Sequence, residues 1–156
     1  MSRGCARTAL KHRLQTIVES RQLPYKGSKG DLKTPTVCEQ RSSVNNDGLP
    51  DAPSVTVKIS KVKQTGDDRL GAVTIITKTY SEDSEQGYRD AENLIEAIEI
   101  DLISNPWLDS RYPLVGSWET DIVDDNFPVF FAALTCSVEL PSIKCRVGPD
   151  GKNIEV

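Results

Sequence analysis

The chain has 156 residues, and this length, with 37% hydrophobic and 27% charged residues, is typical of a single globular domain over 1–156. The net charge of −4 argues against a protein whose main task is to grip nucleic acid, because such binding depends on Lys and Arg neutralising phosphates. No stretch approaches the roughly 18 apolar residues of a membrane-spanning helix, and residues 1–10 lack the apolar core of a secretory signal. We therefore expect a soluble protein made in a cytoplasm, with no membrane partner.

The first predicted element is a helix over residues 6–21. Its apolar residues recur at spacings close to 3.6 and form one stripe: Ala9, Leu10, Leu14, Ile17 and Val18. Pro24 lies just beyond the predicted end, where proline is common. His12, the only histidine, falls on the polar side, and we interpret it as a solvated surface residue.

Residues 22–53 differ in composition from the rest of the chain. They are rich in Gly, Pro, Ser and Asn and contain few apolar residues. A long segment of this kind within a compact domain is usually either functional or disordered. We predict a mobile loop or arm here, which could include a short strand near residues 35–40.

The next predicted feature is a β-hairpin made of residues 54–62 and 71–80. In its first strand Val55, Val57 and Ile59 alternate with polar residues, and this period of two is typical of a half-buried strand. The return strand is rich in Val, Ile and Thr, which strands favour. Residues 65–68, with the sequence Thr-Gly-Asp-Asp, have the composition of a connecting turn.

The clearest helix follows an acidic approach at residues 81–87, with Ser84 as the predicted N-cap. Asn105 and Pro106 mark its end. Its apolar residues form a continuous face: Tyr88, Ala91, Leu94, Ile95, Ile98, Leu102 and Ile103. Ile100 lies off this stripe, so the helix could contact two different partners.

The last third of the chain returns to strands. Residues 117–123 place Trp118, Thr120 and Ile122 on one face, and residues 124–126 form the predicted turn. Residues 129–140 alternate strongly between apolar and small or polar side chains, which predicts a central strand. The tail from Pro141 to the end at 156 is polar, and we expect it to fray.

This order of elements predicts an α+β fold. We expect an antiparallel or mixed four-stranded sheet with two helices packed on one face, plus a long N-terminal loop. The matching apolar stripes predict which residues meet in the core. Leu94, Ile98 and Leu102 should pack on the face of the sheet that bears Leu134, Cys136 and Val138.

No residue pattern indicates catalysis, a cofactor or a metal site. A nucleophile–base pair would have to use His12, which lies beside no obvious nucleophile. The cysteines, at 5, 38, 136 and 145, form no CxxC pair and are interpreted as free thiols, with Cys136 as a small core residue and a disulfide among the others as the alternative. We therefore predict that the protein is not an enzyme and that it has no catalytic, cofactor-binding or metal-binding residues.

Two groups of side chains have both a structural and a functional interpretation. The carboxylates fall into two clusters: Glu82, Asp83 and Glu85, and Asp121, Asp124 and Asp125. Both lie in turns or at a helix start, where acidic residues are favoured for structural reasons. The aromatic residues Trp107, Tyr112 and Trp118 are interpreted as core, although exposed aromatics there would mark a protein interface.

Residues 78–107 carry a more specific pattern. A strand ends in Tyr80-Ser-Glu-Asp, a helix begins with Gly87-Tyr-Arg-Asp and continues with Asn93-Leu-Ile-Glu, and the segment closes with Asn105-Pro-Trp. This segment resembles small tail proteins of long-tailed bacteriophages and prophages, and the resemblance covers about residues 54–140. The family is that of the tail terminator, or tail completion, proteins.

The resemblance implies a structural virion protein located in the tail, assembled in the host cytoplasm. Such proteins form a ring, commonly a hexamer, at the head-proximal end of the tail tube, where they stop tube growth and provide the head-joining surface. The implied partners are copies of the chain itself, the tail tube protein and a head–tail connector protein, with genomic DNA passing through without specific binding. Another connector, a minor tail component and a non-virion cytoplasmic binding module remain alternatives.

Five residues are predicted to contact neighbouring subunits or the tube. Tyr80, Glu82, Asp83 and Glu85 form the acidic turn, and Ile100 is the apolar residue outside the main stripe. A monomer gains nothing obvious from either feature, whereas a ring could cover both.

Overall fold

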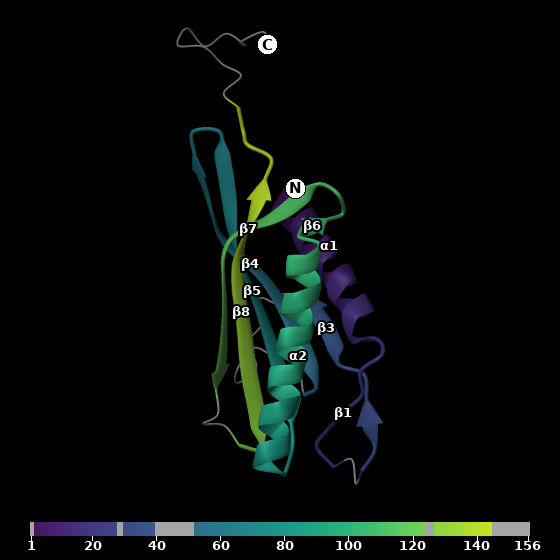
Figure 1. The fold of residues 1–156 in the computed structure, drawn as a ribbon. Coiled ribbons are helices and arrows are strands. Elements are labelled where there is room, and N and C mark those ends of the chain that lie inside the picture. Colours follow the sequence, from purple (N-terminus) through teal and green to yellow (C-terminus); the bar gives the residue numbers. More distant parts are fainter. Residues whose placement is uncertain (1, 28–29, 40–51, 124–126, 145–156) are drawn as a thin grey trace, which may run out of the picture.

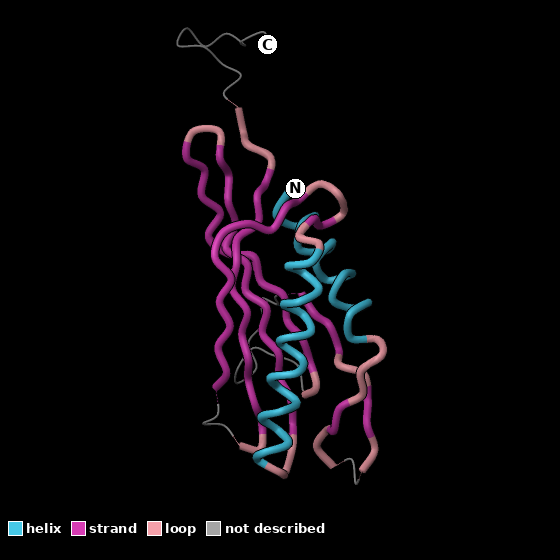
Figure 2. Tube along the Cα trace, viewed as in Figure 1, coloured by secondary structure: helices cyan, strands magenta, loops and turns pink. Residues whose placement is uncertain are grey.

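The structure is a computed structural model that describes residues 2–27, 30–39, 52–123 and 127–144 (Figure 1). These ranges contain two helices and eight strands, whose distribution along the chain is coloured in Figure 2. In chain order the elements are α1 (Ser2–Val18), β1 (Leu23–Pro24), β2 (Leu32–Lys33), β3 (Thr36–Glu39), β4 (Ser54–Thr65), β5 (Asp68–Tyr80), α2 (Ser84–Ser104), β6 (Trp107–Leu108), β7 (Tyr112–Val123) and β8 (Val129–Leu140).

The main sheet has six strands in the order β3-β4-β5-β8-β7-β6, so the prediction of a four-stranded sheet is wrong. The four long strands that the sequence predicted form its centre, and the short strands β3 and β6 extend it on either side. β3 runs parallel to β4, while the other neighbours are antiparallel. Strands of four and two residues are too short to display alternation, which is why β6 was not predicted.

The predicted N-terminal loop contains regular structure in its described part. β1 and β2 form a separate two-stranded antiparallel sheet, in which Leu23 pairs with Lys33. β3 lies within the short strand considered at residues 35–40 and joins the main sheet, with Val37 opposite Val55. Residues 28–29 and 40–51 of the predicted arm lie outside the described residues, as do the predicted turn at 124–126 and most of the tail.

Both helices pack on the same face of the main sheet (Figures 1 and 2). α2 lies over β8 and β5, and α1 lies over β3 and β4. The core between helices and sheet includes Ile98 and Leu102 from α2 and Leu134 and Cys136 from β8, all buried. Leu94 and Val138 belong to the same cluster, so the predicted core pairing is confirmed.

The helices differ from their predicted bounds in ways that local chemistry explains. α1 covers residues 2–18 rather than 6–21, and Ala6 extends the buried stripe of Leu10, Leu14 and Val18 by one turn. His12 is exposed, as predicted. The N-cap of α2 is Asp83 rather than Ser84.

Neither described helix is long and apolar enough to cross a membrane.

The Asp83 carboxylate caps α2 by accepting hydrogen bonds from the backbone N–H groups of Glu85 (3.1 Å) and Gln86 (3.3 Å). Asp83→Ala is expected to lower the free energy of unfolding by about 1 kcal/mol, the usual cost of an N-cap loss. Ser84→Ala is the matched control, because Ser84 is the first helical residue and should cost less than about 0.5 kcal/mol. Urea unfolding of both variants checks the assignment, and a larger loss for Ser84→Ala would contradict it.

β7 begins at Tyr112, five residues before the predicted start at 117. The pairing of β7 with β8 shifts register between Val115 and Glu119, and Gly116 there adopts a φ of +83°, a conformation that glycine tolerates best. This bulge interrupts the alternation of side chains, and so periodicity alone placed the start of the strand at 117, although the family resemblance also includes a strand at Tyr112–Trp118.

Candidate functional site

The structure separates the five predicted interface residues into two places. Tyr80, Glu82, Asp83 and Glu85 lie at the N-terminal end of α2, whereas Ile100 lies near its C-terminal end. At a rise of about 1.5 Å per residue, roughly 22 Å of helix separates Glu85 from Ile100. A single small contact therefore cannot include both groups of residues.

The acidic turn is organised by its own hydrogen bonds. The Tyr80 hydroxyl donates to Glu82 Oε1 (3.0 Å), and this bond is the main cause that raises the pKa of Tyr80 above its ordinary value. The Ser81 hydroxyl donates to the Asp83 carbonyl (2.9 Å) and accepts from the Asp83 N–H (3.1 Å). Asp83 therefore has a structural role, while Glu82 and Glu85 present exposed carboxylates at this end of the helix.

Three exposed apolar residues lie near the C-terminal end of α2, and together we call them the α2 apolar patch. It consists of Ile100, Ile103 and Trp107, whose exposed fractions are 65%, 49% and 51%. Ile100 was predicted to lie off the main stripe, and its exposure confirms this. Ile103 and Trp107 were predicted to be core, and this was wrong: Leu102 and Leu108 take the buried positions beside them.

The charges around the patch are unequal on the two helices. α2 contains six acidic residues and one basic residue, and its Glu92 and Glu96 are exposed. α1 contains four basic residues and no acidic ones. The helical face of the protein therefore combines an acidic helix with an apolar end and, beside it, a basic helix.

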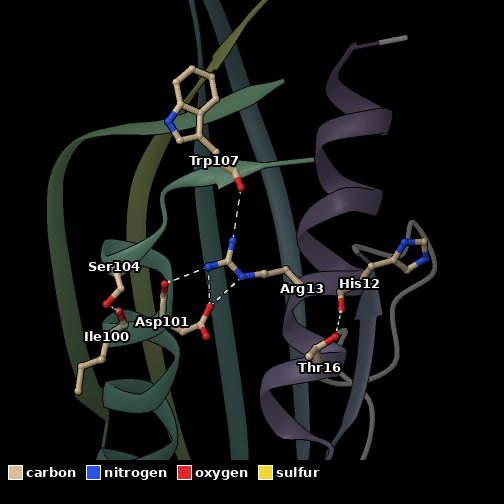
Figure 3. Close-up of polar contacts among 7 residues, drawn as sticks. All are labelled: His12, Arg13, Thr16, Ile100, Asp101, Ser104 and Trp107. Carbon is tan, nitrogen blue, oxygen red and sulfur yellow. Dashed lines mark hydrogen bonds and ion pairs between the residues drawn. The ribbon is translucent and has the colours of Figure 1, made fainter. Parts of the chain in front are cut away.

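Arg13 of α1 fixes the base of the patch (Figure 3). Its Nε donates to Asp101 Oδ1 (2.8 Å), its Nη2 to the Asp101 carbonyl (3.0 Å) and its Nη1 to the Trp107 carbonyl (3.4 Å). The guanidinium thus joins α1, the last turn of α2 and β6, and it places a positive charge where the helix dipole favours one. The patch is presented on a firmly braced corner of the fold.

The hydrogen bonds of Arg13 had no signal in the sequence. Arg13 and Asp101 are 88 positions apart, and both occupy the polar sides of their helices. Sequence periodicity reports only which side of a helix is apolar, so it does not reveal a polar pair between two helices. Only the packing of α1 beside α2 brings the two residues together.

A groove of about 580 Å³ runs along α1 beside this corner. It is lined by Gly4, Cys5, Thr8, Ala9, His12, Arg13, Thr16, Leu108 and Asp109. Among the described residues the His12 imidazole has no hydrogen-bond or ion-pair partner, and Figure 3 shows it pointing away from Arg13. The described part of the chain also contains no group of three His, Cys, Asp or Glu residues that could hold a metal ion.

The described cysteines are free thiols: Cys5 is exposed, and Cys38 and Cys136 are buried. Burial raises the pKa of the Cys136 thiol to about 12, so this group stays protonated and unreactive at neutral pH. Cys136 is a core residue, as predicted. Cys145 lies outside the described residues.

The second carboxylate cluster is represented only by Asp121, an exposed residue of β7. Asp124 and Asp125 lie outside the described residues. Of the aromatic group, Tyr112 is buried and Trp118 packs partly buried against the core, as predicted. Trp107 alone reaches the surface to a large extent, which places it in the patch rather than the core.

In comparisons with known proteins, the sequence matches no protein-family model and no curated protein.

Proposed function

We propose that the chain is a structural virion protein, a tail terminator of a long-tailed bacteriophage. It forms a ring of identical subunits on the head-proximal end of the tail tube, stops tube growth and provides the surface to which the head joins. Two arguments support the proposal: the resemblance of residues 78–107 to this family, and the α2 apolar patch. The patch is the single structural observation that carries an assembly role.

The patch has the composition of the centre of a protein interface. Trp107 and two isoleucines are exposed near this end of α2, and exposed aromatic residues contribute most to binding in protein interfaces. The surrounding glutamates supply a polar rim, which is the usual arrangement of an interface. Because Arg13 braces the underlying backbone, docking a partner here costs little additional ordering.

The charge of the protein is compatible with DNA passing through a ring. The formal net charge is −4, and most of the acidic excess on the helical face lies on α2. A negatively charged wall repels phosphates and favours sliding over binding. This supports a conduit for DNA in preference to a sequence-reading protein.

Ile100→Lys tests the role of the patch. The lysine lies four residues after Glu96 and can form a favourable i,i+4 pair, so folding should be spared. We expect a thermal unfolding midpoint close to that of the original protein, together with tails of abnormal length or tails that fail to join heads. Leu32→Lys is the matched control: Leu32 is 48% exposed but lies on β2, away from the patch, and should assemble normally.

The terminator function itself is tested by removing the protein from an assembling phage. We expect overlong or headless tails in electron micrographs. Normal tails should return when the protein is supplied again. Normal infectious particles made without the protein would exclude the tail-terminator proposal. Normal tails made with a folded Ile100→Lys variant would exclude the patch from the interface.

A further inference from the structure

We infer that a pocket between the small β1–β2 sheet and one end of the main sheet binds the phosphate group of a nucleotide, either free or within a single strand of nucleic acid. We call it the lysine pocket. The inference goes beyond the proposed function and is tested on the isolated protein. The pocket is lined by Tyr25, Lys26, Lys33, Ala52, Lys78, Tyr80, Pro128 and Val129.

The lysine pocket has the size and the mixed lining of a small-molecule site. Its volume is about 590 Å³, and such sites usually measure about 300–1,000 Å³. Ala52, Pro128 and Val129 supply apolar surface, and Tyr25 and Tyr80 supply aromatic rings. Aromatic side chains are the groups on which nucleic-acid bases stack. The lining therefore offers contacts to a base as well as to a charged group.

The positive charge of the pocket comes from three lysines on two separate sheets. Lys33 belongs to β2, Lys26 lies two residues after β1, and Lys78 belongs to β5. None of the described residues that line the pocket is acidic. Glu82, which accepts a hydrogen bond from the Tyr80 hydroxyl (3.0 Å), is not among them. The pocket is thus a local basic site in a chain of net charge −4, and it favours an anion.

Two of the ammonium groups lie against aromatic rings. Lys33 Nζ is 5.2 Å from the centroid of the Tyr25 ring, and Lys78 Nζ is 5.8 Å from that of Phe131. These contacts restrict the two side chains before any ligand arrives, which lowers the cost of ordering them on binding. An ammonium group has three N–H donors, so contact with a ring leaves donors for the oxygens of an anion.

The number of lysines favours phosphate over carboxylate. A phosphate monoester carries about −1.5 to −2 charges and three acceptor oxygens. A carboxylate carries one charge on two oxygens. Three ammonium groups therefore match a phosphate better than they match a single carboxylate.

The lysine pocket and the acidic helix α2 lie on opposite faces of the main sheet. Phe130 of β8 faces α2, because its ring occupies the space beside Gly87. Successive side chains of a strand alternate between faces, so Val129 points away from the helices, as does its register partner Tyr80. The repulsion of phosphates by α2 and their attraction by the pocket therefore act on different surfaces.

Neutralising the pocket lysines is the first test. A chain carrying Lys26→Gln, Lys33→Gln and Lys78→Gln should bind ATP about tenfold or more weakly than the original protein, in calorimetric titrations without magnesium. The affinity of the original protein should fall as salt is raised, because salt screens the attraction between the lysines and the phosphates. Thermal unfolding shows whether the variant is folded.

The control removes the same charge from another part of the chain. Lys58, Lys61 and Lys63 lie on β4, none of whose residues lines the pocket. Changing all three to Gln should leave the affinity for ATP unchanged, and equal losses in the two variants would overturn the inference. If the triple pocket variant does not fold, Lys26→Gln with Lys33→Gln is compared with Lys61→Gln with Lys63→Gln, which are all exposed positions.

Further titrations of the original protein identify the ligand. Tighter binding of ATP than of tripolyphosphate would support contact with the base, and equal or tighter binding of tripolyphosphate would overturn a nucleotide as the ligand. A short single-stranded oligodeoxynucleotide that binds more tightly than ATP would assign the pocket to a strand, and one that binds more weakly would assign it to the free nucleotide. Polyglutamate that binds more tightly than both would indicate an acidic protein segment and overturn the inference, as would the absence of binding by ATP and the oligonucleotide.

Discussion

Replacing Ile98 by alanine is expected to lower the free energy of unfolding by about 2–5 kcal/mol, the range for truncating a buried aliphatic side chain. Ile98 is fully buried between α2 and the sheet, in the same cluster as Leu134 and Cys136. Its removal leaves a cavity that the neighbouring strands can fill only in part, because they are held by continuous pairing. Denaturant unfolding followed by circular dichroism measures the loss.

Ile100→Ala is the matched control for this prediction. It is the same substitution in the same helix, two residues away, but Ile100 is exposed. Its effect on the free energy of unfolding should stay within about 0.5 kcal/mol, as is usual for surface positions. Equal losses for the two variants would contradict the assignment of Ile98 to the core and of Ile100 to the surface.

Gly87→Ala is expected to destabilise the protein by about 3 kcal/mol, the upper part of the usual range for overpacking a core. A Cβ atom at Gly87 would overlap Cε2 of the Phe130 ring and lie 2.5 Å from its Cζ. That ring is buried, with Tyr88 at 5.6 Å and Phe127 at 6.2 Å between ring centroids, so it has little room to move. The absence of a side chain at Gly87 therefore permits the first turn of α2 to approach β8.

Two further variants make this prediction specific. Gly4→Ala, in α1, has no atom within 4 Å of the new Cβ and should be neutral or stabilising by up to about 1 kcal/mol, since alanine favours helices. Adding Phe130→Leu to Gly87→Ala should restore part of the lost stability, because leucine is smaller than phenylalanine and leaves room for the new Cβ atom. Thermal unfolding of the set tests the contact, and a Gly87→Ala protein as stable as the original would disprove it.

The sequence by itself determined the elements whose pattern is local and long. β4 and β8 were recognised from alternation and both helices from a 3.6-residue period, because solvent on one side and core on the other select residue types along many consecutive positions. β5 was recognised from its Val, Ile and Thr content. The same reasoning identified the core residues Ile98 and Leu134 and the exposed Ile100. Each of these predictions depends on a regular helix or strand that has the core on one side and water on the other.

Only the tertiary structure decided the features that depend on contacts between distant positions. The short strands β3 and β6 exist because neighbouring strands offer them backbone partners, and neither is long enough to show a pattern of its own. The Arg13–Asp101 pair and the exposure of Trp107 follow from which elements lie side by side. Because such contacts join residues far apart in the chain, no periodicity in the sequence predicts them.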